Sequence, residues 1–277
     1  MRGLERPTVD RENLRRVGTT SAVVVALAQG ATAVVALRRG RRDYADAVWG
    51  PGLAAVAATS AVVGRGSRFR RWATAVGVAA WATRLERLMV GRLRGSDEED
   101  DRYTEFLEGD STAKAALKVF GTQALAQVLV SAPVQLSAAS RVPTGRRRWL
   151  VPVGLGVMAA GAVVEATADR QKAAFMEEKK AAKERGDDDV PGILDTGLWG
   201  WSRHPNYFGD SLFWDGAWIV SAASPGAAWT LPAPVAMTYF LVYATGAKRT
   251  ERKMEDRPGY QDYQRRVAFF FPRPPRD

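Results

Sequence analysis

The sequence contains no cysteine and only one histidine, His204. Without cysteine the chain can form neither disulfide bonds nor thiolate ligands, so cysteine usage favours no redox compartment. One histidine leaves carboxylates as the remaining metal ligands, which do not suit a tightly held transition metal. We therefore expect no metal site.

Acidic residues are outnumbered, with 30 Asp and Glu against 40 Lys and Arg, and the net charge is +10. The basic residues are dispersed in short clusters between apolar stretches, whereas nucleic-acid-binding proteins concentrate them on one face or in one tail. We therefore expect no nucleic-acid partner. The clusters are typical of loops that flank membrane helices. The mean hydropathy of -0.21 is low for a membrane protein because these loops dilute the apolar runs.

Long uncharged runs organise the chain. Val17–Leu37 has 21 residues without a charge, which is enough for a helix across about 30 Å of hydrocarbon. Four further runs of spanning length carry at most one charge: Ala45–Val63, Val119–Ser140, Trp149–Ala168 and Ala227–Ala247. Two weaker runs, Trp72–Val90 and Asn206–Ala223, carry several charges. Uncharged stretches of this length would be unusual in a soluble bundle of alanine-rich helices.

The expected fold class is therefore all-α, a polytopic membrane helix bundle of about seven transmembrane helices. Residues 17–247 form this bundle, residues 1–16 an N-terminal extension, and residues 248–277 a C-terminal tail that completes the site. The first run lacks a following small-residue cleavage pattern, so we expect a retained span. The basic residues from Lys248 onward favour a cytosolic C-terminus in an integral, multi-pass membrane protein. Nothing in the sequence points to a particular oligomeric state.

The segment Gly197–Asp210 holds His204 and opens an apolar run. Pro205 fits the first position of a helix, where its missing N–H costs nothing. Arg203 and His204 then lie at the positive, donor-rich end of that helix, where phosphate groups bind. The alternative is a juxtamembrane loop whose Trp, Tyr and Arg side chains anchor it at the interface. The concentration of Arg, His, Asn and Asp in eight residues favours a site.

Several ionisable residues interrupt apolar runs, including Asp46, Glu86, Asp169 and Asp210. Burying such a group in lipid costs a few kcal/mol, so it usually faces a bundle interior or a water-filled cavity. This pattern favours a bundle that holds a polar ligand. After the last run, the polar segment Thr250–Arg266 predicts a short helix and then a turn at Pro258-Gly259.

The central segment resembles the signature of the C-terminal domain of steroid 5-alpha-reductases and their relatives. The matching residues are Gly197-Leu198-Trp199 and Ser202-Arg203-His204-Pro205-Asn206-Tyr207-Phe208-Gly209-Asp210. Further matches to an uncharacterised bacterial and plant branch are Asp46-Ala47-Val48-Trp49-Gly50, Asp101-Arg102-Tyr103, Arg257-Pro258-Gly259-Tyr260 and Tyr263-Gln264-Arg265-Arg266. The resemblance extends from about Asp46 to the C-terminus and includes sterol reductases and isoprenylcysteine carboxyl methyltransferases as more distant relatives.

The resemblance implies a seven-helix membrane reductase that takes NADPH from the cytosolic side. Cofactor-contacting positions of the superfamily are matched by Asn206 and Asp210. Cofactor-lining positions of sterol reductases are matched by Arg203, His204 and Tyr207. A further acidic position of the steroid reductases is matched by Asp169, and Lys172 lies close to it in the sequence. Ser202, Tyr260 and Tyr263 belong to the same motifs and are expected at the cofactor, and Glu251 is expected there with them. This implies an oxidoreductase of lipid metabolism that acts on CH–CH groups.

The residues that bind and protonate the substrate in the steroid enzymes are not matched in this sequence. Their tyrosine falls near Ala82 here, and their C-terminal histidine and tyrosine lack counterparts. Reduction of a conjugated double bond needs a hydride from the cofactor and an acid near the oxygen, either a tyrosine or a carboxylic acid whose pKa is raised by desolvation. Asp46, Glu86 and Tyr103 are the candidates. An apolar cavity between spans would suit a lipophilic small-molecule substrate that enters among membrane lipids.

Two alternatives remain. Membrane methyltransferases share Arg-His-Pro-x-Tyr-x-Gly and two glutamates four residues apart, a spacing that Glu251 and Glu255 reproduce. This alternative implies S-adenosylmethionine as the ligand. A non-catalytic membrane scaffold that has kept the fold is the other.

Overall fold

The computed structural model describes residues 9–95, 98–142, 145–187, 191–244 and 246–276, and the regular elements in these ranges are all helical. This confirms the all-α part of the predicted fold class. In chain order they are α1 (Arg11–Arg39), α2 (Tyr44–Ala47), α3 (Trp49–Val63), α4 (Arg68–Arg94), α5 (Asp101–Phe106), α6 (Thr112–Ala116), η1 (Leu117–Gly121), α7 (Thr122–Val130), α8 (Ala132–Ala139), η2 (Arg146–Trp149), α9 (Leu150–Arg185), η3 (Gly197–Gly200), α10 (Pro205–Ala222), η4 (Ala227–Thr230), α11 (Pro232–Tyr239), η5 (Phe240–Ala244), α12 (Ala247–Met254) and α13 (Tyr260–Arg266).

The chain divides into two compact units that alternate along the sequence. The first unit comprises Met1–Leu155 and Ala217–Ala236, and the second comprises Gly156–Gly216 and Met237–Asp277. The boundaries fall within α9, α10 and α11, so each of these three helices contributes residues to both units.

Four helical stretches in the described residues are long and apolar enough to cross a membrane: Arg11–Arg39, Tyr44–Val63, Arg146–Arg185 and Ala227–Met254. Thr112–Val130 and Ala132–Ala139 add a fifth if the pair, bent by 44°, is one span. These five stretches contain the five cleanest runs of the sequence. The two weaker runs do form helices, α4 and α10, which are not among these stretches. The count of seven therefore stays a prediction.

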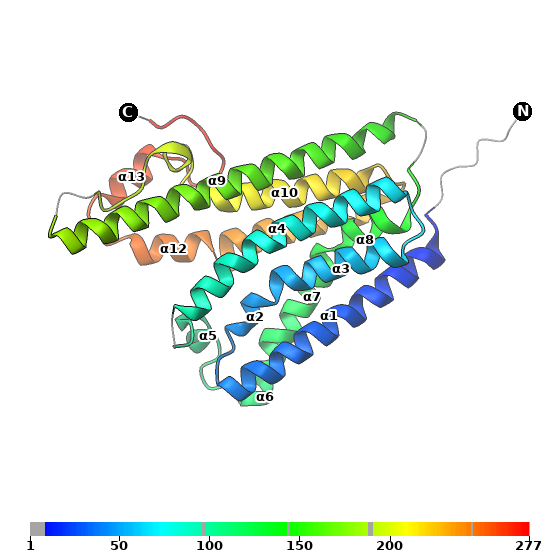
Figure 1. The fold of residues 1–277 in the computed structure, drawn as a ribbon, viewed down its shortest axis with the longest axis horizontal. Coiled ribbons are helices and arrows are strands. Elements are labelled where there is room, and N and C mark those ends of the chain that lie inside the picture. Colours follow the sequence, from blue (N-terminus) through cyan, green and yellow to red (C-terminus); the bar gives the residue numbers. More distant parts are fainter. Residues whose placement is uncertain (1–8, 96–97, 143–144, 188–190, 245, 277) are drawn as a thin grey trace, which may run out of the picture. The chain divides into compact units, whose positions relative to one another are not determined.

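In the first unit, α1, α3 and α4 lie side by side (Figure 1). The buried faces combine apolar residues such as Val56 and Trp81 with a seam of polar side chains. On this seam Ser21 and Ser60 are 3.3 Å apart, and the Gln29 amide donates to Gln127 Oε1 at 3.0 Å. Such hydrogen bonds hold helices together where lipid removes the hydrophobic drive for association.

Gln127 also forms hydrogen bonds with the backbone at Val48, where α2 ends and α3 begins. Its Nε2 donates to the carbonyl oxygens of Val48 and Trp49 at 3.0 Å each. A Cβ on Gly52 would clash with this amide, so glycine makes room for it. The Val48 carbonyl oxygen also accepts from the Gly52 N–H at 2.9 Å, so the Gln127 amide is a second donor to it.

In the second unit, α9 and α10 approach each other through glycines. A Cβ on Gly161 would lie 2.6 Å from the carbonyl oxygen of Gly209, closer than real side chains permit. Figure 1 shows these two helices side by side. The C-terminal segment follows as α12, a turn with Gly259 at φ 79°, and α13. The predicted short helix and turn after Thr250 are confirmed, with the first helix beginning three residues earlier.

Candidate functional site

α9 holds the loop that precedes α10. The loop turns at Gly197, whose φ of 60° favours glycine, and the backbone N–H of Leu198 donates to Gln171 Oε1 on α9 at 3.1 Å. A Cβ at Gly197 would also meet the Gln171 side chain. The Trp199 indole N–H donates to the carbonyl oxygen of Ala168 at 3.0 Å, and Lys172 lies 5.9 Å from the centroid of the Trp199 ring. α9 and this loop therefore form one support for the motif that follows.

α10 begins at Pro205, as the sequence predicts. Ser202 stabilises the backbone just before α10. Its hydroxyl accepts from the His204 N–H at 3.1 Å and donates to the carbonyl oxygen of Phe270 at 2.8 Å. His204 is 3% exposed. Its ring stacks on Tyr207 at 5.8 Å and meets the edge of Phe269 at 5.3 Å. The C-terminal segment thus packs directly against the motif.

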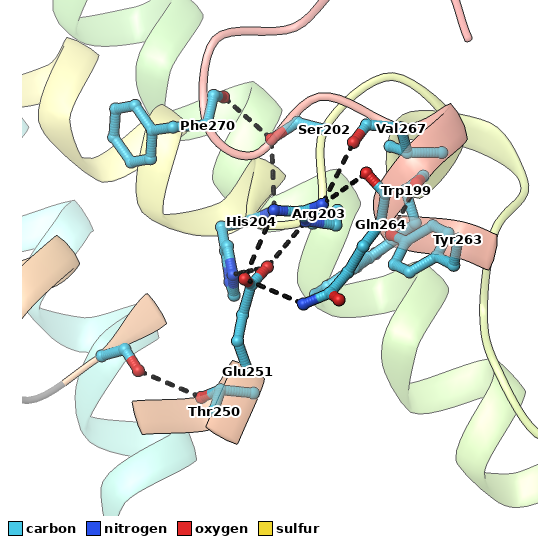
Figure 2. Close-up of polar contacts among 11 residues, drawn as sticks. Trp199, Ser202, Arg203, His204, Thr250, Glu251, Tyr263, Gln264, Val267 and Phe270 are labelled. Carbon is cyan, nitrogen blue, oxygen red and sulfur yellow. Dashed lines mark hydrogen bonds and ion pairs between the residues drawn. The ribbon is translucent and has the colours of Figure 1, made fainter. Parts of the chain in front are cut away.

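Glu251 on α12 joins the two basic residues of the motif (Figure 2). Its Oε1 lies 2.7 Å from Arg203 Nε and 3.3 Å from His204 Nε2. Its Oε2 accepts from Arg203 Nη2 at 3.3 Å and from the Gln264 amide at 3.3 Å. The side chains of Arg203 and Glu251 are only 11% and 15% exposed, which makes this a largely desolvated ion pair.

The remaining donors of Arg203 are directed to backbone. Nη1 donates to the carbonyl oxygens of Gln264 at 2.7 Å and Val267 at 3.5 Å, and the backbone N–H donates to Ala268 at 2.8 Å. The sequence suggested that Arg203 would hold a phosphate. In this structure the guanidinium connects α12 and the end of α13 to the motif, and its place at the cofactor stays a prediction.

Asn206 occupies the first turn of α10. Its Nδ2 donates to Asp169 Oδ1 on α9 at 3.3 Å, so the structure brings together two residues that the resemblance assigned to the cofactor. The Asn206 Oδ1 atom is buried and has no hydrogen-bond partner in the described part of the chain. Asp210 lies one turn further along α10 and is 4% exposed. Lys172 is exposed on α9.

Tyr260 and Tyr263 belong to a small core with Val267, which Ile193 and Met254 flank. The Tyr263 hydroxyl donates to the carbonyl oxygen of Trp199 at 2.7 Å. Burial, together with the nearby charge of Glu251, raises the pKa of Tyr260 to about 12. Burial also raises the pKa of Tyr263. In the structure these two tyrosines support the motif loop from the side of α13.

The catalytic candidates belong to the first unit. The Tyr103 hydroxyl on α5 donates to Asp46 Oδ1 at 2.7 Å, and the Gln123 amide reaches the same hydroxyl at 3.5 Å. The sequence named Asp46 and Tyr103 separately, and the structure joins them. Glu86 lies on α4, with Oε2 buried and without a hydrogen-bond partner among the described residues.

Sequence reasoning missed several residues of this site. Gln171, Gln264, Phe269 and Phe270 contact the motif residues, and none was named as a candidate. Phe270 acts through its carbonyl oxygen, which every residue type has, so no side-chain pattern reveals it. Gln264 acts both through its carbonyl oxygen and through its side-chain amide. The only sequence signal for Gln264 is its place in the motif Tyr263-Gln264-Arg265-Arg266.

The fold and the site together define a helical protein with several membrane-length apolar helices and a buried Arg–Glu–His cluster at the start of α10. Residues 33–267 match a family described as protein of unknown function (DUF1295). The chain belongs to this family, which is a steroid 5-alpha-reductase-like family. No curated protein and no solved structure matches the chain.

Proposed function

We propose that this chain is a membrane-embedded, NADPH-dependent reductase of a carbon–carbon double bond in a lipophilic substrate of steroid, sterol or isoprenoid type. The proposal places it in the bacterial and plant branch of the superfamily, with seven spans and a cytosolic C-terminus. The observation that supports this proposal most directly is the buried Asn206 Oδ1 atom, which has no hydrogen-bond partner in the described residues although the Asn206 amide donates to Asp169.

The buried Asn206 Oδ1 atom needs a donor, because an unsatisfied buried polar atom costs about 1–3 kcal/mol. Hydroxyl or carboxamide groups of a nicotinamide nucleotide can supply such a donor. Asp169, already bonded to the Asn206 amide, can accept from a second hydroxyl. The residues present therefore fit a polar, hydroxyl-rich ligand at the first turn of α10.

The phosphates of the nucleotide require cationic donors. Arg203 is engaged by Glu251, so its part in the proposal is to position α12 rather than to bind phosphate. α12 itself carries Lys248, Arg252 and Lys253, which are exposed. We assign phosphate binding to this helix.

When bound, NADPH would supply the hydride. The chain must then stabilise the negative charge that develops on the substrate and deliver one proton. The Tyr103 hydroxyl can release its one proton to the substrate when the hydroxyl turns away from Asp46, to which it donates in this structure, and the Gln123 amide reaches the same oxygen. Apolar helix surfaces exclude water, which strengthens electrostatic interactions around the reacting groups.

The test is the thermal stability of the detergent-solubilised full chain with NADPH, NADP, S-adenosylmethionine or no ligand. A ligand that binds only the folded state raises the midpoint temperature of unfolding. At a ligand concentration of 100 times the dissociation constant, the gain in apparent stability is about 2.7 kcal/mol. We expect NADPH to produce the shift and Asn206→Ala to abolish it. Arg252→Gln should weaken the shift, and Arg185→Gln, an exposed arginine at the end of α9, is its matched control.

Each other outcome contradicts the proposal in a defined way. A shift with S-adenosylmethionine alone would identify a methyltransferase. Folded protein that responds to none of the ligands would identify a non-catalytic scaffold. An unaltered NADPH shift in Asn206→Ala would move the cofactor away from the start of α10.

A further inference from the structure

Four arginines gather where α4 begins in the first unit. Arg65, Arg68, Arg70 and Arg71 lie within seven residues, and α4 starts at Arg68. The first turn of α4 contains no acidic residue. Because a helix N-terminus already carries partial positive charge, this is an unfavourable place for cations unless an anion is present.

The protein supplies no such anion among the residues that the structure describes. No carboxylate there forms an ion pair with any of the four arginines. Arg65 and Arg68 are exposed, and Arg71 is half-buried with its Nε atom buried and unpartnered. The positive charge at this end of α4 is therefore left uncompensated.

Arg70 holds part of this charge in the interior. Its side chain is 0% exposed. The guanidinium donates to Ser224 Oγ at 2.7 Å, to Ser140 Oγ at 3.0 Å and to the carbonyl oxygen of Ser140. Its partners are thus all neutral, and its Nε atom has none in the described chain. The contacts fix the start of α4 against the end of α8, so the charge is built into the fold.

An open groove begins beside these arginines. Arg68, Phe69, Trp72, Ala73 and Val76 line it, and its volume is about 1010 Å³. Phe69, Trp72 and Val76 are 69%, 43% and 65% exposed and follow one stripe of the helix. From Phe69 to Val76 the stripe extends about 10 Å, which is most of the depth of one bilayer leaflet.

We propose that this groove binds one anionic phospholipid. The phosphate contacts Arg68, with Arg65, Arg70 and Arg71 adding to the attraction, and an acyl chain lies along Phe69, Trp72 and Val76. A cationic end followed by an apolar floor matches an anionic headgroup attached to a hydrocarbon chain. Trp72 sits where tryptophan is enriched in membrane proteins, next to the headgroups. The inference rests on the proposed membrane location and not on the proposed reaction.

The experiment titrates the detergent-solubilised full chain with phosphatidylglycerol, with phosphatidylcholine of the same acyl chains, and with glycerol phosphate. Native mass spectrometry counts the bound molecules. We expect one tightly bound phosphatidylglycerol and at least tenfold weaker binding of the other two. Replacing Arg65 and Arg68 together by glutamine should weaken phosphatidylglycerol binding roughly 30-fold. Both are exposed, so the variant should fold.

Arg92→Gln combined with Arg94→Gln is the matched control, because these exposed arginines lie at the other end of the same helix. The control should bind phosphatidylglycerol within twofold of the unmodified chain. Equal binding of the two phospholipids, or the same loss in the control, would overturn the proposal. Binding of glycerol phosphate as tight as that of the lipid would show an anion site that takes no lipid. These readouts need no NADPH, so they are independent of the reductase test.

Discussion

Gly161 on α9 and Gly209 on α10 face each other with no room for a side chain between them. A Cβ at Gly209 would lie 2.8 Å from the carbonyl oxygen of Gly161 and 2.6 Å from the backbone nitrogen of Glu165. The glycine of the central motif therefore has a packing role. It lets α10 approach α9 closely enough for Asn206 to reach Asp169.

Gly209→Ala should destabilise the protein by about 1–3 kcal/mol, because the added methyl group meets rigid backbone. Gly156→Ala is the control, since this exposed glycine of α9 has nothing within 4 Å of the added Cβ. Alanine there should raise stability by roughly 0.5–1 kcal/mol. Thermal unfolding in detergent measures both changes. Equal stability of the two variants would refute the close crossing.

Arg203→Gln should cost about 3 kcal/mol, because it leaves the largely buried Glu251 without its main counter-charge. Arg265→Gln removes an arginine of the same unit from an exposed ion pair with Asp262, whose side chains are 71% and 51% exposed. That change should cost less than about 0.5 kcal/mol. Unfolding midpoints compare the two, and a loss of similar size in both would contradict the buried pair.

Stability should fall at high pH through Tyr260. Its pKa is raised to about 12 in the folded protein by burial and by the nearby charge of Glu251. A phenol in the unfolded chain ionises near about pH 10. The stabilisation from the protonated phenol is therefore complete below about pH 10 and is lost as the pH rises toward about 12. Near-ultraviolet titration and unfolding midpoints measure the effect. Tyr260→Phe should reduce the dependence, and Tyr263, whose pKa burial also raises, should account for the part that remains. A phenylalanine variant with the same slope would exclude Tyr260 as its source.

Tyr103→Phe should lower NADPH-dependent turnover by about 10²–10⁴-fold if its hydroxyl provides the proton. The stability cost should stay at about 1.5–3 kcal/mol, the range for a hydrogen bond to a charged group. Tyr44→Phe is the control, because Tyr44 and Tyr103 pack against the same apolar cluster. Full turnover in Tyr103→Phe would remove this residue from the chemistry.

The helical class of the fold followed from the sequence by length and charge alone. Four of the five cleanest apolar runs became helical stretches that could span a membrane, and the fifth does so if its bent helix pair is one span. Hydrocarbon admits a single chain segment only when its own backbone is satisfied. Pro205 likewise determined where α10 starts, because proline at the first helical position loses no hydrogen bond.

Only the tertiary structure determined which groups pair with the buried arginines as hydrogen-bond and ion-pair partners. The sequence marked Arg203 as a phosphate ligand, but its partners Glu251, Gln264 and Val267 lie 48 to 64 residues away. Two of these three partners are carbonyl oxygens, which carry no residue signature. The same holds for Arg70, whose guanidinium the fold buries against Ser140 and Ser224. Local patterns specify helices because a helix satisfies its own backbone, whereas the partner of a buried charge depends on segments that only folding brings together.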